Sequence, residues 1–212
     1  MENNFELFPM FSSPIALTTI EEDTDELNNY KDFVFSATDK LSNSNYNTTT
    51  KNFNDTKRVL EYYPKIKKIL LNKFKDYADD VLKYNNDYMI TTSWISNINK
   101  GGSAQRHNHK NSLYSGIYYF QDSYPEDCAS LEFSSPILQL SDFMISPAIP
   151  DVINSHSWKI NPKSKLLIFF PSYLHHQIHI HKNDKPRRSL AFNIVPIGRY
   201  GKGDSTYDLS WR

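Results

Sequence analysis

The chain has 212 residues, of which 39% are hydrophobic and 14% are aromatic. This size and composition predict one folded domain with a substantial apolar core, and they argue against a disordered chain. Lysine plus arginine equals aspartate plus glutamate, at 24 each, so there is no overall basic field that would attract long nucleic acid or an anionic membrane surface.

Cysteine usage and the absence of apolar runs exclude further classes of protein. Cys128 is the only cysteine, which excludes a disulfide framework and argues against a cysteine-based zinc site. The first residues do not read as a signal peptide. No apolar run approaches the ~18 residues that a membrane-spanning helix needs. We therefore expect no contact with a membrane.

The first 86 residues predict one edge strand, one loop and one helical region. Residues 5–18 are extended and carry two prolines, a pattern that suits a strand at a sheet edge. Residues 37–56 are rich in Asn, Ser and Thr and predict a loop. Residues 57–84 carry apolar side chains at three- and four-residue steps, which predicts a helix packed outside a sheet. Pro64 breaks or restarts that helix.

Beyond residue 86 the chain changes to short runs rich in Ile, Tyr, Phe, Thr and Ser, separated by turn residues. The expected strands cover residues 88–98, 112–121, 129–133, 142–145, 157–160, 166–170, 175–181 and 187–196. This order predicts an α+β chain that is mainly β, with a jelly-roll core and helices packed outside it. We expect a single domain with an N-terminal part over 1–86, the core over 87–197 and a tail over 198–212.

The histidines are confined to the strand-rich half, between residues 107 and 181. His107 and His109 are two residues apart, so in an extended chain both imidazoles point to the same side and can reach one ion. Iron(II) binds imidazole nitrogen well, and non-heme oxygenases hold it on one face so that the other positions stay open. The alternative is a surface His-x-His in a loop that follows two glycines.

A second group of histidines follows the apolar run over 166–170, where the chain turns at a proline. His175 and His176 point to opposite sides of a strand, so only one of them can be a ligand, and parity alone leaves open which one. His179 and His181 share the parity of His175, and we expect them on a solvated strand face. A His-rich tract that binds metal adventitiously is the other interpretation.

The strand over 187–196 distributes its side chains in an unusual way. Read with a period of two, one face carries Arg187, Ser189, Ala191 and Asn193, and the other carries Leu190, Phe192 and Ile194. If the apolar face packs on the helix, the polar face points inward, where an unpaired guanidinium is very costly. Arg187 with a nearby hydroxyl is well shaped to hold a carboxylate. A structural salt bridge from Arg187 is the alternative.

Taken in order, these segments resemble the 2-oxoglutarate/iron(II) oxygenase superfamily, and in particular a small group of its phage and bacterial members. The resemblance covers roughly residues 88–197. Its pieces are Ser93-Trp94, Lys100-Gly101, His107-Asn108-His109, Asn111-Ser112, Ser115-Gly116-Ile117-Tyr118-Tyr119, Leu131-Glu132-Phe133, Phe170 through His176, Arg187-Arg188-Ser189 and Phe192-Asn193. The resemblance implies a double-stranded β-helix, which is a jelly-roll, cupin-like barrel, and a dioxygenase of the hydroxylase type that uses Fe(II), 2-oxoglutarate and O2.

The resemblance also implies a role for each site residue. It places the metal ligands at His107, His109 and His176. It places the co-substrate contacts at Arg187, Ser189 and Tyr119, with Tyr118 as the alternative tyrosine. The wider superfamily has an acidic residue where His109 stands, so Glu132 or a water molecule is an alternative third ligand.

The sequence is compatible with several substrates and several functions. The second substrate is a peptide or protein side chain, a metabolite or a modified nucleotide, and the balanced charge argues against long nucleic acid. The competing functions are a non-catalytic jelly-roll protein that binds metal or ligand, a three-histidine metalloenzyme of the cupin type without 2-oxoglutarate, and an assembly protein with a decayed site. Arg187 and Ser189 favour the oxygenase, because a structural metal needs no carboxylate clamp. The expected location is the cytoplasm, or the host cytoplasm for a phage-encoded chain.

Overall fold

A computed structural model describes residues 6, 10–27, 45–51, 58–137 and 146–209 of the chain. One α-helix, α1 (Pro64–Tyr77), accompanies the strands of these residues. The strands are β1 (Ala16–Thr19), β2 (Asn45–Lys51), β3 (Asp87–His107), β4 (Tyr114–Tyr118), β5 (Leu131–Ser134), β6 (Ser157–Ile160), β7 (Leu166–Pro171), β8 (His176–Ile178), β9 (Arg187–Tyr200) and β10 (Tyr207–Leu209). No helix among the described residues is both long enough and apolar enough to cross a membrane.

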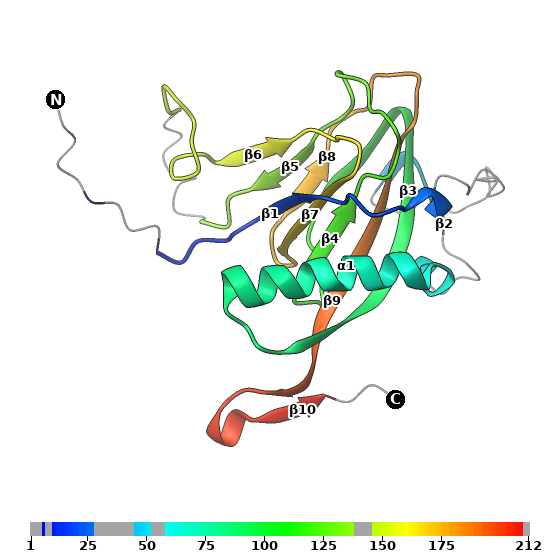
Figure 1. Ribbon diagram of the computed structural model, residues 1–212. Coiled ribbons are helices and arrows are strands. Elements are labelled where there is room, and N and C mark those ends of the chain that lie inside the picture. The colour runs from blue at the N-terminus through cyan, green and yellow to red at the C-terminus, as the bar shows by residue number, and fades with distance from the viewer. Residues whose placement is uncertain (1–5, 7–9, 28–44, 52–57, 138–145, 210–212) are drawn as a thin grey trace.

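The strands form one antiparallel sheet in the order β1-β7-β4-β9-β3-β8-β5-β6, with β2 added to β3 and β10 added to β9. Strand neighbours are far apart in the chain, so long-range pairing defines the fold. In Figure 1 the sheet curls and α1 lies across one of its faces. This architecture confirms the predicted mainly-β fold class with the helix packed outside.

The helix forms where the apolar periodicity predicts it. Pro64 occupies its first turn, where the missing N–H would have no partner in any case. The buried face of the helix consists of Ile66, Leu70, Phe74 and Tyr77. The flanking residues continue as a 3-10 turn over Val59–Tyr62 and a π-helical turn over Ala78–Leu82, which Lys83 ends with a φ of +58°. The predicted restart at Pro64 is therefore confirmed.

The sheet separates two apolar clusters, one on each face. Between α1 and the sheet, the buried side chains include Phe74, Phe169 and those of the apolar face of β9. The inner cluster includes Phe133, Phe170 and Leu174. The predicted alternation of β9 is confirmed, because Leu190, Phe192 and Ile194 pack toward α1 whereas Arg187 and Ser189 are buried on the opposite side.

Strand β3 is longer than predicted, and its extra length positions the candidate site. It was expected to end at residue 98, yet it runs to His107. Residues 87–98 pair with β9, and Ala104 and His107 pair with β8. Gly101, with a φ of +79°, allows the strand to change neighbours at this point instead of stopping. The first histidine therefore lies at a strand end that pairs with β8 and not in a loop.

Other boundaries differ from the predictions in both halves of the chain. Residues 45–51 lie in the predicted loop but form β2, where a run of threonines favours extended structure. The predicted strand over 175–181 shrinks to β8, and the expected tail contains the β9–β10 hairpin. The edge strand expected within 5–18 is β1, paired with β7. The strand predicted over 142–145 lies outside the described residues.

Candidate active site

Three histidines from two segments of the chain converge. His107 ends β3 and pairs across the ladder with His176, the first residue of β8, while His109 lies two residues beyond β3. One ligand nitrogen from each of the three lies within 4.8 Å of the others. It is the one cluster of three or more metal-ligating side chains found in the part of the chain that the structure describes. The structure therefore brings together the three residues that the family resemblance implied as ligands.

Backbone carbonyl groups orient two of the imidazoles. The Nδ1 atom of His107 is 2.7 Å from the carbonyl oxygen of Gln105, and Nδ1 of His176 is 3.0 Å from that of Leu174. A carbonyl oxygen only accepts, so each Nδ1 carries the proton and donates it. The lone pair is then on Nε2, the nitrogen left to bind a metal.

Side chains orient the third imidazole. Nδ1 of His109 is 2.7 Å from Oδ1 of Asn193 and 2.8 Å from Oγ of Ser115. The amide of Asn193 is itself held, because its Nδ2 donates to Oγ1 of Thr92 over 2.9 Å. His109 therefore also donates from Nδ1 and keeps Nε2 free. Asn193 and Ser115 stood in the motifs that carried the resemblance, but nothing in the sequence indicated that they would contact this histidine.

Burial keeps two of these histidines neutral. The pKa of His109 is lowered to about 4 and that of His176 to about 3, mainly by desolvation and to a smaller extent by the neighbouring imidazoles. A hydrogen bond to Asn193 opposes the shift at His109. Neutral imidazole is the form that binds a metal ion, so both side chains are ready ligands at neutral pH.

Arg187 at the start of β9 is fully buried. Its Nε donates to the carbonyl oxygen of Ala129 over 3.0 Å and its Nη2 donates to the hydroxyl of Tyr119 over 2.6 Å. Its Nη1 has no hydrogen-bond partner, and among the described residues no carboxylate pairs with this guanidinium. Tyr118 points the other way, to Oγ1 of Thr24. Of the two tyrosines considered, Tyr119 is the one beside Arg187.

Ser189 is the remaining residue that the sequence assigned to the co-substrate. It follows Arg187 by two positions on the same face of β9, and its side chain is buried. Further along this face, Asn193 contacts His109. One face of one strand therefore connects the guanidinium to the histidine group.

Glu132, considered as an alternative ligand, is not brought to the three histidines. It lies on β5 between two residues of the inner cluster, so its side chain leaves the opposite face of the sheet. There its carboxylate accepts from Gln177 and His179, each over 2.9 Å. Partial burial raises the pKa of the Glu132 carboxyl, but the hydrogen bonds from His179 and Gln177 outweigh it. The pKa of Glu132 is therefore lower than usual.

The other histidines separate in a way that parity alone does not explain. His175 is exposed and His179 is half-buried against Glu132, which fits the expected outer face. His181 is fully buried, so the expectation that it lies on a solvated face is wrong. The reason is that β8 ends at Ile178, and the irregular chain beyond it turns this imidazole into the protein.

The sequence family described as "Putative 2OG-Fe(II) oxygenase" matches residues 92–193, a range that contains all three histidines and Arg187. No curated protein matches the chain.

Solved structures with this fold come from several organisms. HygX of Streptomyces hygroscopicus, with nickel and 2-oxoglutarate bound, aligns at a TM-score of 0.56 and 13% identity over 87% of this chain and 83% of its own. A prolyl-4-hydroxylase of Pseudomonas putida aligns at 0.53 and 12% identity over 86% and 93%. The chain spans 49% of an oxidoreductase of the 2OG-Fe(II) oxygenase family from Burkholderia pseudomallei, at a TM-score of 0.42 and 12% identity over 56% of this chain. The chain is therefore similar in sequence to the 2OG-Fe(II) oxygenase family over residues 92–193, and it shares the fold of these solved structures.

Proposed function

We propose that His107, His109 and His176 hold Fe(II), and that Arg187, Ser189 and Tyr119 bind 2-oxoglutarate. The buried guanidinium of Arg187 is the observation that carries this proposal. It has an unpartnered Nη1 and no carboxylate partner in the described part of the chain. A buried unpaired charge is very costly, and a dicarboxylate co-substrate removes that cost by pairing with it.

Tyr119 orients the guanidinium of Arg187 by a hydrogen bond and by the contact of its ring. Its hydroxyl accepts from Nη2, and its ring lies 5.0 Å from Cζ of Arg187. Burial raises the pKa of the Tyr119 phenol, so it stays protonated in spite of the neighbouring positive charge. A phenol that accepts from arginine still has its own proton to donate. Arg187 and Tyr119 therefore offer two donors to one carboxylate.

The three histidines suit the metal that the family uses. They are nitrogen donors with the Nδ1 side occupied, and they leave the remaining coordination positions open. Bound there with 2-oxoglutarate and O2, iron supplies oxidative decarboxylation coupled to oxidation of a second substrate. Neutral imidazoles bring no negative charge, so the co-substrate supplies the charge compensation. We expect 2-oxoglutarate to slow the loss of the metal from the protein.

The second substrate is a peptide or protein side chain or a small metabolite, and similar structures include a prolyl-4-hydroxylase of Pseudomonas putida and HygX with hygromycin B bound. We further propose that the chain acts as a single domain in a cytoplasm, and that it belongs with the phage and bacterial group that carries His-x-His.

Anaerobic titration of the Fe(II)-loaded protein with 2-oxoglutarate tests the proposal. Chelation by the co-substrate at an open Fe(II) site gives a weak visible charge-transfer band, and we expect that band to appear and saturate. Incubation in air should then release succinate. Iron binding without the band would instead favour a three-histidine enzyme that does not use 2-oxoglutarate, or a metal-binding protein without catalysis.

A further inference from the structure

His181 is a fully buried histidine that the proposed chemistry does not use. It follows β8, and its main chain is fixed to the bend of β3. Its N–H donates to the carbonyl oxygen of Gly102 over 2.8 Å, and its own carbonyl oxygen accepts from Gly101 over 2.7 Å. The imidazole therefore starts from a rigid position.

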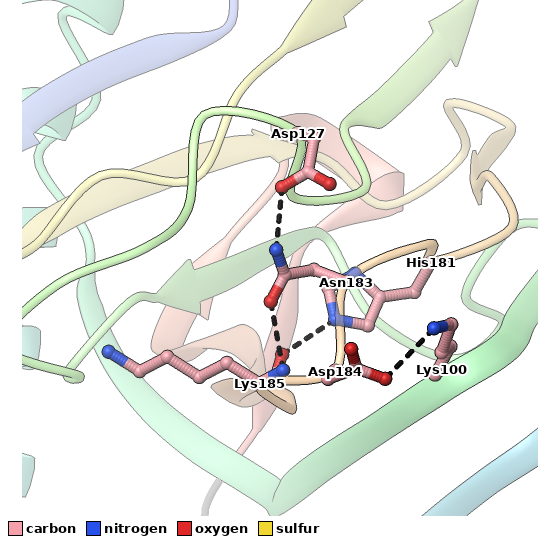
Figure 2. A network of polar contacts seen from close by, with 6 residues as sticks. All are labelled: Lys100, Asp127, His181, Asn183, Asp184 and Lys185. Atoms are coloured by element: carbon pink, nitrogen blue, oxygen red, sulfur yellow. Dashed lines mark hydrogen bonds and ion pairs between the residues drawn. The ribbon is translucent and has the colours of Figure 1, made fainter.

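The side chain of His181 joins two further segments. Nε2 lies 2.8 Å from the carbonyl oxygen of Lys185, which only accepts, so Nε2 carries the proton. Nδ1 then has the lone pair, and it accepts the backbone N–H of Ala129 over 3.3 Å. Figure 2 shows the contact to Lys185, together with the loop that leads to it. A neutral imidazole of this tautomer satisfies both groups.

Both contacts lead directly to the guanidinium. Ala129 makes both contacts with its main chain: its N–H donates to His181, and its carbonyl oxygen accepts from Nε of Arg187. The carbonyl group that accepts from His181 belongs to Lys185, two residues before Arg187 on the same chain. The imidazole thus contacts Ala129, whose carbonyl oxygen accepts from Arg187, and Lys185, which precedes Arg187 in the sequence.

We propose that His181 is a positioning residue for the co-substrate clamp, and this inference rests on the proposed role of Arg187 in binding 2-oxoglutarate. Through Ala129, His181 fixes Nε of the guanidinium, and with Nη2 on Tyr119 this leaves Nη1 as the free donor. Loosening the Ala129 peptide allows the guanidinium to rotate. The cost then falls on 2-oxoglutarate affinity, while the metal group remains as it was.

The loop around His181 supplies a matched control. Asn183 accepts from the N–H of Lys185 and donates to Asp127, each over 2.8 Å, which braces the loop. Lys100 and Asp184 form an ion pair of 2.9 Å in which both side chains are exposed. An exposed pair of this kind contributes little. Lys100→Ala, on β3, therefore removes a contact of the same loop without removing a contact of the guanidinium.

Two conservative variants separate the contacts of the imidazole. In His181→Asn, Oδ1 stands one bond from Cγ, as Nδ1 does, and keeps an acceptor for Ala129. In His181→Gln, the longer side chain keeps a donor near the place of Nε2, for Lys185, and leaves the Ala129 N–H without a partner. If His181 acts through Ala129, only the glutamine variant loses co-substrate affinity.

Calorimetric titration of each Fe(II)-loaded variant with 2-oxoglutarate under anaerobic conditions tests this. We expect His181→Gln to weaken 2-oxoglutarate binding about tenfold, the effect of one unsatisfied buried donor, and His181→Asn and Lys100→Ala to stay within about threefold of the unchanged protein. Fe(II) affinity, measured separately, should stay within about twofold in all of them. With saturating co-substrate, succinate release by the glutamine variant should return to the unchanged rate.

Each other outcome has one meaning. If the unchanged protein does not bind 2-oxoglutarate, or binds it equally after Arg187→Ala, the proposed function fails and the role of His181 fails with it. If those two tests succeed and His181→Gln binds 2-oxoglutarate normally, only the role of His181 is wrong. If the asparagine and glutamine variants lose Fe(II) and 2-oxoglutarate alike, His181 is structural. If the glutamine variant does not fold, or if both variants lose 2-oxoglutarate affinity alone, the role assigned to the contact with Ala129 is wrong.

Discussion

Hydrogen bonds to Nδ1 decide which nitrogen of each clustered histidine is free, and the sequence does not reveal them. The sequence indicated that His107 and His109 share a side, because parity follows from an extended chain. The choice of His176 over His175 came from family resemblance, since parity alone left both open. The partners of Nδ1 on His107 and His176 are backbone carbonyl oxygens, which every residue has, so no sequence pattern identifies them.

Arg187→Ala is expected to weaken 2-oxoglutarate binding roughly 100-fold, because it removes one partner of a buried charge pair. Fe(II) affinity should change by less than about twofold, since this side chain donates to Ala129 and Tyr119 and not to the histidines of the site. Arg188→Ala is the matched control, because that guanidinium donates to Asn97 instead. Anaerobic titration measures both affinities, and equal binding by the two variants would disprove the clamp.

His176→Ala is expected to abolish stoichiometric Fe(II) binding, whereas His175→Ala should keep it. His176 is buried among the three converging nitrogens, and His175 is exposed. Metal content after dialysis against Fe(II) under anaerobic conditions measures the difference. Equal loss from both variants would mean that His176 is not distinguished from His175 as a ligand.

Strand β4 needs a residue without a side chain at Gly116, where it lies beside Phe192 of β9. A Cβ atom on Gly116 would lie 2.2 Å from the ring of Phe192, which is fully buried in the cluster beneath α1. The alternation of β9 was predictable, because a polar inner face and an apolar outer face have a period of two. The continuation of β3 past Gly101 was not, because a glycine that bends a strand and a glycine that ends one look alike in a sequence.

Gly116→Ala is expected to lower the free energy of unfolding by about 1–3 kcal/mol, as overpacking in a filled core does. Urea denaturation of the metal-free protein measures it. Adding Phe192→Leu should recover part of the loss, because it removes the ring atoms that the new methyl group meets. If the double variant loses as much free energy of unfolding as the two single variants together, the methyl group at position 116 does not clash with the ring of Phe192.

Across the whole molecule, long-range pairing places the site, and this is the part that the sequence reveals least. The chain order of the strands is readable, but β7 lies between β1 and β4, and β9 between β4 and β3. Nothing local specifies such neighbours. The fold class and the outer helix were predictable because apolar periodicity is local, and the burial of His181 was not, because it follows from where three distant segments meet.

The metal-free protein should lose stability as the pH falls from about 6.5 toward 4.5. The unfolded chain takes up protons on histidine near 6.5, while burial lowers the pKa of folded His109 to about 4 and of His176 to about 3. The unfolded state therefore binds more protons in this window, and each group contributes a slope of up to about 1.4 kcal/mol per pH unit. Stability is retained above the window, and below it the carboxylates also titrate.

Urea midpoints at a series of pH values, with chelator present, measure this slope. His109→Gln and His176→Gln should each make the slope shallower, whereas His175→Gln, at an exposed position, should leave it unchanged. A slope that is the same in all four proteins would show that these imidazoles are not buried as neutral groups.

The hydrogen bonds that hold every Nδ1 also bear on which metal the protein carries when it is purified. A triad of neutral nitrogens already fixed in place has no ligand that discriminates in favour of iron, and affinity for such donors rises along the first-row series from iron through nickel to copper. At the proposed site we therefore expect trace nickel or zinc in a buffer to outcompete Fe(II), and a preparation loaded with either ion to be inactive. Selectivity for iron then belongs to the supply of metal in the cell and not to this triad.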